Sequence, residues 1–223
     1  MPSPLPAIIF DLDGTLIDSA PDVAVALNRL LQREGRPAVT LAQVQSFVGE
    51  GPGPLIERAF AATGSGPAPA TLPELIAAYV AFYQEAPADH TLVFPGVREM
   101  LAALAGRTRL GLCTNKPDAM VRPVLEALGL ADSFTALVGG DFPRRKPDGE
   151  HLRETLRRMG LAPDAPAVMV GDSPTDIAAA REAGLPVLVV DFGYSRVPVT
   201  ELGADRVLSG FADLPAVVAE IIR

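Results

Sequence analysis

The feature that most constrains the fold of this chain is a repeated alternation of short apolar runs with amphipathic helical patterns. Each run is continuous and mostly aliphatic, which is typical of a strand buried on both faces of a parallel sheet. The runs cover residues 7–10, 109–114, 135–140, 167–171, 186–191 and, more weakly, 206–208. Because strands that alternate with helices are joined by right-handed crossovers, the pattern predicts an α/β fold with a parallel-sheet, Rossmann-like core.

Helix signals between the apolar runs favour the same fold. Apolar residues recur at helical spacing over 97–104 and 121–128. A further helix is expected to begin after Ser173, because Asp176 completes an S-x-x-D capping box there, and to end near Gly184.

Residues 20–90 break the alternation, because helical patterns follow one another there without a strand between them. The first helix has apolar residues between 23 and 31 and is expected to be capped at Ser19. Further helices are expected at about 41–48, 53–63 and 72–86, separated from one another by glycine- and proline-rich loops at 49–54 and 64–69. We therefore expect a helical insertion between the first and second strands, hinged near residues 16–20 and 88–95.

The composition limits the classes of partner. A net charge of −8 argues against a nucleic-acid surface, which needs clustered basic residues. No apolar stretch approaches the roughly 20 residues that span a bilayer, so no membrane partner is expected. The single cysteine, Cys113, excludes an intrachain disulfide, and residues 1–6 lack the basic and apolar regions of a signal peptide. We therefore expect a cytoplasmic protein, and the sequence leaves its oligomeric state open.

Two carboxylates, Asp11 and Asp13, directly follow the first predicted strand. Side chains at i and i+2 of an extended chain point the same way, so these two acids can converge on one spot. Two carboxylates at such a short separation repel each other, so a nearby cation or a shared proton is needed to stabilise them. An ordinary strand-ending turn is the alternative explanation, since Asp and Gly are common in turns.

Polar residues follow three further strands, at the edge of a parallel sheet where ligands gather. Together with the first pair they form four groups: Asp11 and Asp13; Thr114, Asn115 and Lys116; Lys146; and Asp172 with Asp176. Lys146 and Lys116 are the only two lysines in a chain that otherwise uses arginine, which indicates a need for a compact ammonium group. These groups predict a polar site at the carboxyl ends of the strands.

The order of these groups resembles the four motifs of the haloacid-dehalogenase-like phosphohydrolases. The matching residues are Asp11-x-Asp13-Gly14-Thr15, Thr114-Asn115, Lys146 and Gly171-Asp172-x-x-x-Asp176. The match covers nearly the whole chain, and the helical insertion corresponds to the mobile cap of that superfamily. The resemblance implies an α/β catalytic core of residues 1–18 and 92–223 and a helical cap domain of residues 19–91.

Further segments are similar to bacterial phosphoglycolate phosphatases, among them residues 47–51, 55–59, 113–117, 138–141 and 192–194. This likeness implies a small phosphorylated metabolite as substrate, with 2-phosphoglycolate the leading candidate.

The family's pattern also implies roles for the acids. Asp11 would be the nucleophile, forming an aspartyl-phosphate, and Asp13 would protonate the leaving alkoxide and then activate water. A Mg²⁺ cofactor would be held by Asp11, Asp172 and the backbone carbonyl of Asp13.

The remaining motif residues would bind and orient the substrate. Lys146 would neutralise phosphate and nucleophile, while Thr114 and Asn115 hold phosphoryl oxygens. Asp176 would not contact the substrate but would hold Lys146, or the waters bound to the metal, in position. In the cap, Gly49, Glu50 and Gly51 are candidates for a segment that closes over the substrate.

Several alternatives stay open. A hexose phosphomutase related to β-phosphoglucomutase, a phosphatase for another small metabolite, and a non-catalytic binder of phosphorylated ligands share the same core. Arg58, Arg144 and Arg145 could meet a substrate carboxylate or could be solvated. Cys113 is expected to be a buried packing residue, and His90 and His151 are expected at the surface or in a hinge.

The chain departs from the family's pattern in one place. After Lys146-Pro147, where further prolines are common, it reads Asp148-Gly149-Glu150-His151. The shape of this loop is therefore open.

Overall fold

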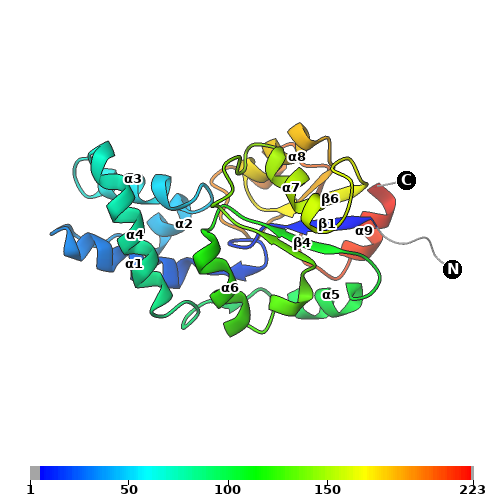
Figure 1. Cartoon of the computed structure of the whole chain (residues 1–223), viewed down its shortest axis with the longest axis horizontal. Coiled ribbons are helices and arrows are strands. Elements are labelled where there is room, and N and C mark those ends of the chain that lie inside the picture. Colours follow the sequence, from blue (N-terminus) through cyan, green and yellow to red (C-terminus); the bar gives the residue numbers. More distant parts are fainter. Residues whose placement is uncertain (1–5, 222–223) are drawn as a thin grey trace.

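One six-stranded sheet organises the computed structural model, which describes residues 6–221 (Figure 1). Its strands lie in the order β5-β4-β1-β6-β7-β8, and every neighbouring pair is parallel. The strands are β1 (Ala7–Phe10), β4 (Leu110–Cys113), β5 (Ala136–Val138), β6 (Ala167–Gly171), β7 (Val187–Val190) and β8 (Arg206–Leu208). Each lies within a run predicted from the sequence, so the α/β fold with a Rossmann-like parallel sheet is confirmed.

Helices cover both faces of this sheet (Figure 1). Ile8 and Phe10 of β1 face one apolar cluster, and Ile9 faces the other, because successive side chains of a strand alternate. The first cluster contains α5 (Val97–Leu104), α6 (Asp118–Ala127) and α9 (Leu214–Ile221). The second contains α7 (Glu150–Arg158) and α8 (Pro174–Ala183). The core therefore lies on both sides of the sheet and holds its strand ends in fixed positions.

The capping box predicted for α8 is present. The Ser173 side chain accepts a hydrogen bond from the Asp176 N–H, and the Asp176 side chain accepts one from the Ser173 N–H. The helix ends at Gly184 in the left-handed conformation, as expected.

A helical lobe stands beside the sheet (Figure 1). It consists of α1 (Ala20–Arg33), α2 (Leu41–Phe47), α3 (Pro52–Ala62) and α4 (Leu72–Gln84), close to the four predicted helices. Within residues 6–221 there are also three short 3₁₀ helices: η1 (Pro69–Thr71), η2 (Ala131–Ser133) and η3 (Val199–Glu201).

Two short strands join the helical lobe to the sheet domain. β2 (Ile17–Asp18) and β3 (Leu92–Val93) pair antiparallel within the two segments predicted as hinges. Ser19 is the N-cap residue of α1, as expected, but its hydroxyl donates to Asp13 and makes no capping bond to the helix.

None of the helices within residues 6–221 has the length and apolar character needed to cross a membrane. The expectation about a signal peptide concerns residues 1–6, of which residues 1–5 lie outside the described residues.

Candidate active site

The candidate site lies where the three central strands end. β1 pairs with β4 on one side and with β6 on the other, so the residues that follow these strands are neighbours. Asp11, Thr114 and Asp172 occupy those three positions and are buried. The sheet topology therefore brings three of the four predicted groups together, and the Lys146 loop supplies the fourth.

Gly14 allows the chain to turn tightly after Asp13. Its φ is +85°, a conformation that favours glycine, and a Cβ there would lie 2.4 Å from Asp172 Oδ2. The following residue, Thr15, donates from Oγ1 to Asp172 Oδ1 at 3.2 Å. The turn thus packs the first motif directly against the fourth.

Asp172 is oriented by two bonds. It accepts from Thr15 through Oδ1 and from the Tyr194 N–H through Oδ2 at 2.7 Å. Tyr194 also accepts from the Ala20 N–H at 3.0 Å through its hydroxyl, at the start of the helical lobe. Sequence reasoning assigned Tyr194 no role, although it lies in a segment that resembles the family.

Lys146 is completely buried between two carboxylates. Its Nζ lies 2.9 Å from Asp11 Oδ1 and 2.6 Å from Asp176 Oδ1, and its side chain is 0 % exposed. Burial lowers the pKa of Lys146, but the negative charges of Asp11 and Asp176 raise it by more than burial lowers it. The pKa therefore lies above its ordinary value, and the ammonium group stays charged. A solvated loop lysine is excluded.

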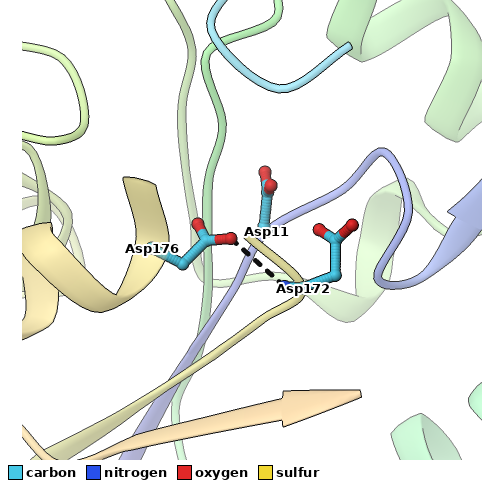
Figure 2. A group of neighbouring side chains, drawn as sticks. All are labelled: Asp11, Asp172 and Asp176. Carbon is cyan, nitrogen blue, oxygen red and sulfur yellow. Dashed lines mark hydrogen bonds between the residues drawn. The ribbon is translucent and has the colours of Figure 1, made fainter. Parts of the chain in front are cut away.

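Three carboxylates lie close together at the site, as Figure 2 shows. Oxygens of Asp11, Asp172 and Asp176 lie within 4.8 Å of one another. Burial raises the pKa of Asp11 to about 7 despite the attraction of Lys146. Burial also raises the pKa of Asp172, and the charges of Asp176 and Asp11 add to that shift. The cluster is therefore short of positive charge.

A divalent cation fits this cluster. Both oxygens of Asp176 are engaged, Oδ1 by Lys146 and Oδ2 by the N–H groups of Asp172 and Ser173 (Figure 2). Asp11 Oδ1, by contrast, is buried and receives no hydrogen bond from residues 6–221, although Lys146 is its ion-pair partner. Each oxygen of Asp172 accepts a single hydrogen bond and keeps a second lone pair, so Asp11 and Asp172 can both offer an oxygen to a cation, and buried carboxylate oxygens suit a hard ion such as Mg²⁺.

The Asp13 side chain points to different partners. Its Oδ1 accepts from Lys116 Nζ at 3.0 Å and also from the Ser19 hydroxyl. Lys116 in turn lies 4.4 Å from the centre of the Tyr83 ring on α4. Asp11 and Asp13 therefore have unlike surroundings, with a separate lysine for each.

Asn115 links the helical lobe to the Lys146 loop. Its Nδ2 donates to the carbonyls of Gly49 and Lys146, both at 3.0 Å. Gly51 also comes close, since a Cβ at its φ of +90° would lie 3.1 Å from the Asn115 carbonyl. Of the predicted lobe candidates, Gly49 and Gly51 thus lie at the site, whereas the Glu50 carboxylate pairs with Arg58 and lies 3.7 Å from Arg196.

A pocket lies between the strand ends and the helical lobe. Its polar lining is Asp11, Asp13, Thr114, Asn115 and Lys116. Its apolar lining includes Val23, Val48, Leu55, Tyr79 and Met120. Thr114 Oγ1 accepts the Lys116 N–H at 3.2 Å, which leaves its hydroxyl proton free to donate. The pocket suits a small anionic ligand with a short carbon chain.

The expectation that His151 lies at the surface or in a hinge is wrong. His151 is fully buried on the inner face of α7 and stacks on Phe142, with ring centres 5.6 Å apart. Its Nδ1 accepts the Lys146 N–H at 3.0 Å, so Nε2 carries the proton and donates to the Gly139 carbonyl at 3.1 Å. Both ring nitrogens are satisfied, which is why burial is tolerated. His90 is exposed and Cys113 is buried, as expected.

None of the three arginines considered for a substrate carboxylate lines this pocket, although the Arg145 guanidinium lies beside Gly51, which does. Arg58 pairs with Glu50 and donates to the Phe47 carbonyl at 3.0 Å. Arg144 is exposed and pairs with Asp148 at 2.9 Å. Arg145 lines a separate surface pocket.

Comparison of the sequence with known proteins identifies the family of this chain. The sequence pattern of the haloacid dehalogenase-like hydrolases matches residues 8–190. The chain is 48% identical over 215 residues to a phosphoglycolate phosphatase of Rhodospirillum rubrum, covering 93% of this chain and 88% of that protein.

Solved structures are similar over the same extent. A predicted phosphoglycolate phosphatase from Haemophilus somnus superimposes with a TM-score of 0.86 at 30% identity, covering 96% of this chain and 97% of that one. CbbY from Rhodobacter sphaeroides, solved with xylulose-(1,5)bisphosphate, gives a TM-score of 0.75 at 27% identity, covering 94% and 96%. This chain therefore belongs to the haloacid dehalogenase-like hydrolase family.

Proposed function

We propose that this protein is a Mg²⁺-dependent phosphatase that hydrolyses 2-phosphoglycolate to glycolate and inorganic phosphate. The observation that carries the proposal is the placement of Asp11, which lines the pocket and lies 2.9 Å from the buried Lys146 ammonium. The relative at 48% identity, which bears the name of this activity, supports the choice of substrate.

In the proposed first step, a carboxylate oxygen of Asp11 attacks phosphorus and the bond from phosphorus to the ester oxygen breaks. The product is an aspartyl-phosphate, which is more readily hydrolysed than the original ester. Lys146 balances the charge of Asp11 and the phosphoryl group, and the Thr114 hydroxyl with the Asn115 N–H holds phosphoryl oxygens. Asp176 keeps Lys146 in place through its 2.6 Å contact.

Asp13 would move the protons. It donates one to the leaving alkoxide and then takes one from the water that attacks the aspartyl-phosphate, which releases phosphate and restores Asp11. Ser19 and Lys116 both contact Asp13 through Oδ1, which leaves Oδ2 for this exchange.

Asp11 and Asp172, with the backbone carbonyl of Asp13, would hold Mg²⁺. The ion supplies positive charge that offsets the phosphoryl oxygens as the reaction proceeds.

The helical lobe would act as a cap. We assign residues 19–91 to it and residues 1–18 and 92–223 to the catalytic core. The bond from Asn115 to the Gly49 carbonyl supports this assignment, because it ties the lobe to a residue of the pocket. A closed lobe would exclude bulk water from the reacting phosphorus.

A second candidate substrate is a sugar bisphosphate, since CbbY was solved with xylulose-(1,5)bisphosphate. Measuring kcat/KM with Mg²⁺ for 2-phosphoglycolate, hexose monophosphates and pentose bisphosphates tests both. We expect 2-phosphoglycolate to have the highest value. A higher value for a bisphosphate would favour the second candidate, and isomerisation of a hexose phosphate without phosphate release would show a mutase.

A further inference from the structure

The pocket offers different partners for the two ends of 2-phosphoglycolate. Asp11, Thr114 and Asn115 serve the phosphoryl end in the proposed reaction. The carboxylate end also needs a partner, because a buried anion without a compensating charge is costly. Among the described residues that line the pocket, Lys116 is the one cation.

Lys116 is built into the site. Its side chain is 3 % exposed, its Nζ lies 3.0 Å from Asp13 Oδ1, and the Tyr83 ring covers it. The ion pair with Asp13 and the contact with the Tyr83 ring hold the Lys116 ammonium group in place. A fixed cation of this kind can hold an anion without first being ordered.

The position of Lys116 matches the leaving-group end of the substrate. Asp13 must reach the ester oxygen to protonate it, and Lys116 contacts Asp13. The substrate's carboxyl carbon is two bonds beyond that ester oxygen. An ammonium group has three donors, so Lys116 can contact Asp13 and a carboxylate together.

The alternative cations are held elsewhere. Arg58 pairs with Glu50, Arg144 with Asp148, and Lys146 lies between Asp11 and Asp176. None of them lines the pocket.

We propose that Lys116 binds the carboxylate of the substrate and thereby selects phosphorylated acids over neutral phosphate esters. This inference rests on the proposed phosphatase function and adds the residue that sets its substrate class.

The test compares 2-phosphoglycolate with ethyl phosphate, in which a methyl group replaces the carboxylate. The readout is the ratio of the two kcat/KM values. Lys116→Met removes the charge and keeps an unbranched apolar stem, and we expect it to lower the ratio about 10- to 100-fold, the range for a lost charged hydrogen bond. Lys116→Gln is a second neutral variant, which can still donate to Asp13, and the same loss is expected.

Arg122→Met is the matched control, because Arg122 is an exposed cation on α6 that pairs with Glu126. It should leave the ratio unchanged. If wild-type enzyme prefers 2-phosphoglycolate but the Lys116 variants keep its ratio, the inference is overturned and the phosphatase function stands. If wild-type enzyme does not distinguish the two esters, the proposed substrate itself is wrong.

Discussion

His151 should make the protein less stable at mildly acid pH. Its Nδ1 accepts the Lys146 N–H, which only a neutral imidazole can do. Burial, with smaller contributions from Lys146, Arg158 and Arg145, lowers the pKa of His151 from 6.5 to about 4. Between pH 6.5 and about pH 4, the unfolded chain therefore binds a proton at His151 that the folded protein does not bind. As a result, the free energy of unfolding falls as the pH falls through this window.

The size of the effect follows from the two pKa values. Between pH 8 and pH 5 the histidine alone should reduce the free energy of unfolding by about 2 kcal/mol. Urea denaturation at several pH values measures this for wild type, His151→Gln and His90→Gln. The amide of His151→Gln does not titrate, so this variant should lack that part of the pH dependence.

His90→Gln is the control, because His90 is the other histidine of the chain and is exposed. It should retain the wild-type pH dependence. Equal pH dependence in wild type and His151→Gln would refute the reasoning, since it would mean that His151 does not resist protonation in the folded protein.

Two further predictions concern the charges of the site. Lys146→Met leaves Asp11 and Asp176 without their shared cation, so we expect kcat to fall by at least about 100-fold and urea denaturation to show a loss of about 3–5 kcal/mol; an unchanged denaturation midpoint would contradict the buried ion pairs. Mg²⁺ at about 100 times its Kd should stabilise the protein by about 2.7 kcal/mol in thermal unfolding, and chelation should stop turnover. Asp172→Asn should abolish the thermal shift, and a full shift in that variant would remove Asp172 from the metal site.

The parts of the fold that were predictable are those specified by local sequence. The apolar run of β1 matches the strand from Ala7 to Phe10, and the signals at Ser173, Asp176 and Gly184 define α8, because strand burial and helix capping act over a few residues. The strands β2 and β3 were not predictable, since two residues carry no periodicity. Their pairing depends on where the helical lobe leaves and rejoins the sheet.

The same limit applies to the site. The four groups of polar residues follow predicted strands, so sheet topology alone indicates that they meet. His151 was misplaced because its partners are the backbone groups of Lys146 and Gly139, which no residue pattern reveals. The spacing of His151, Leu152, Thr155 and Leu156 along α7 is the signal that could have shown its buried side.

The central claim, that Asp11 carries out phosphate-ester hydrolysis in this pocket, is tested most directly by one comparison. Release of inorganic phosphate from 2-phosphoglycolate is measured with Mg²⁺ for wild type and for Asp11→Asn, whose amide is nearly the same shape but is not a nucleophile. We expect rapid release by wild type and a loss of turnover in a variant that remains folded by circular dichroism. Near-normal phosphate release by Asp11→Asn would contradict the account.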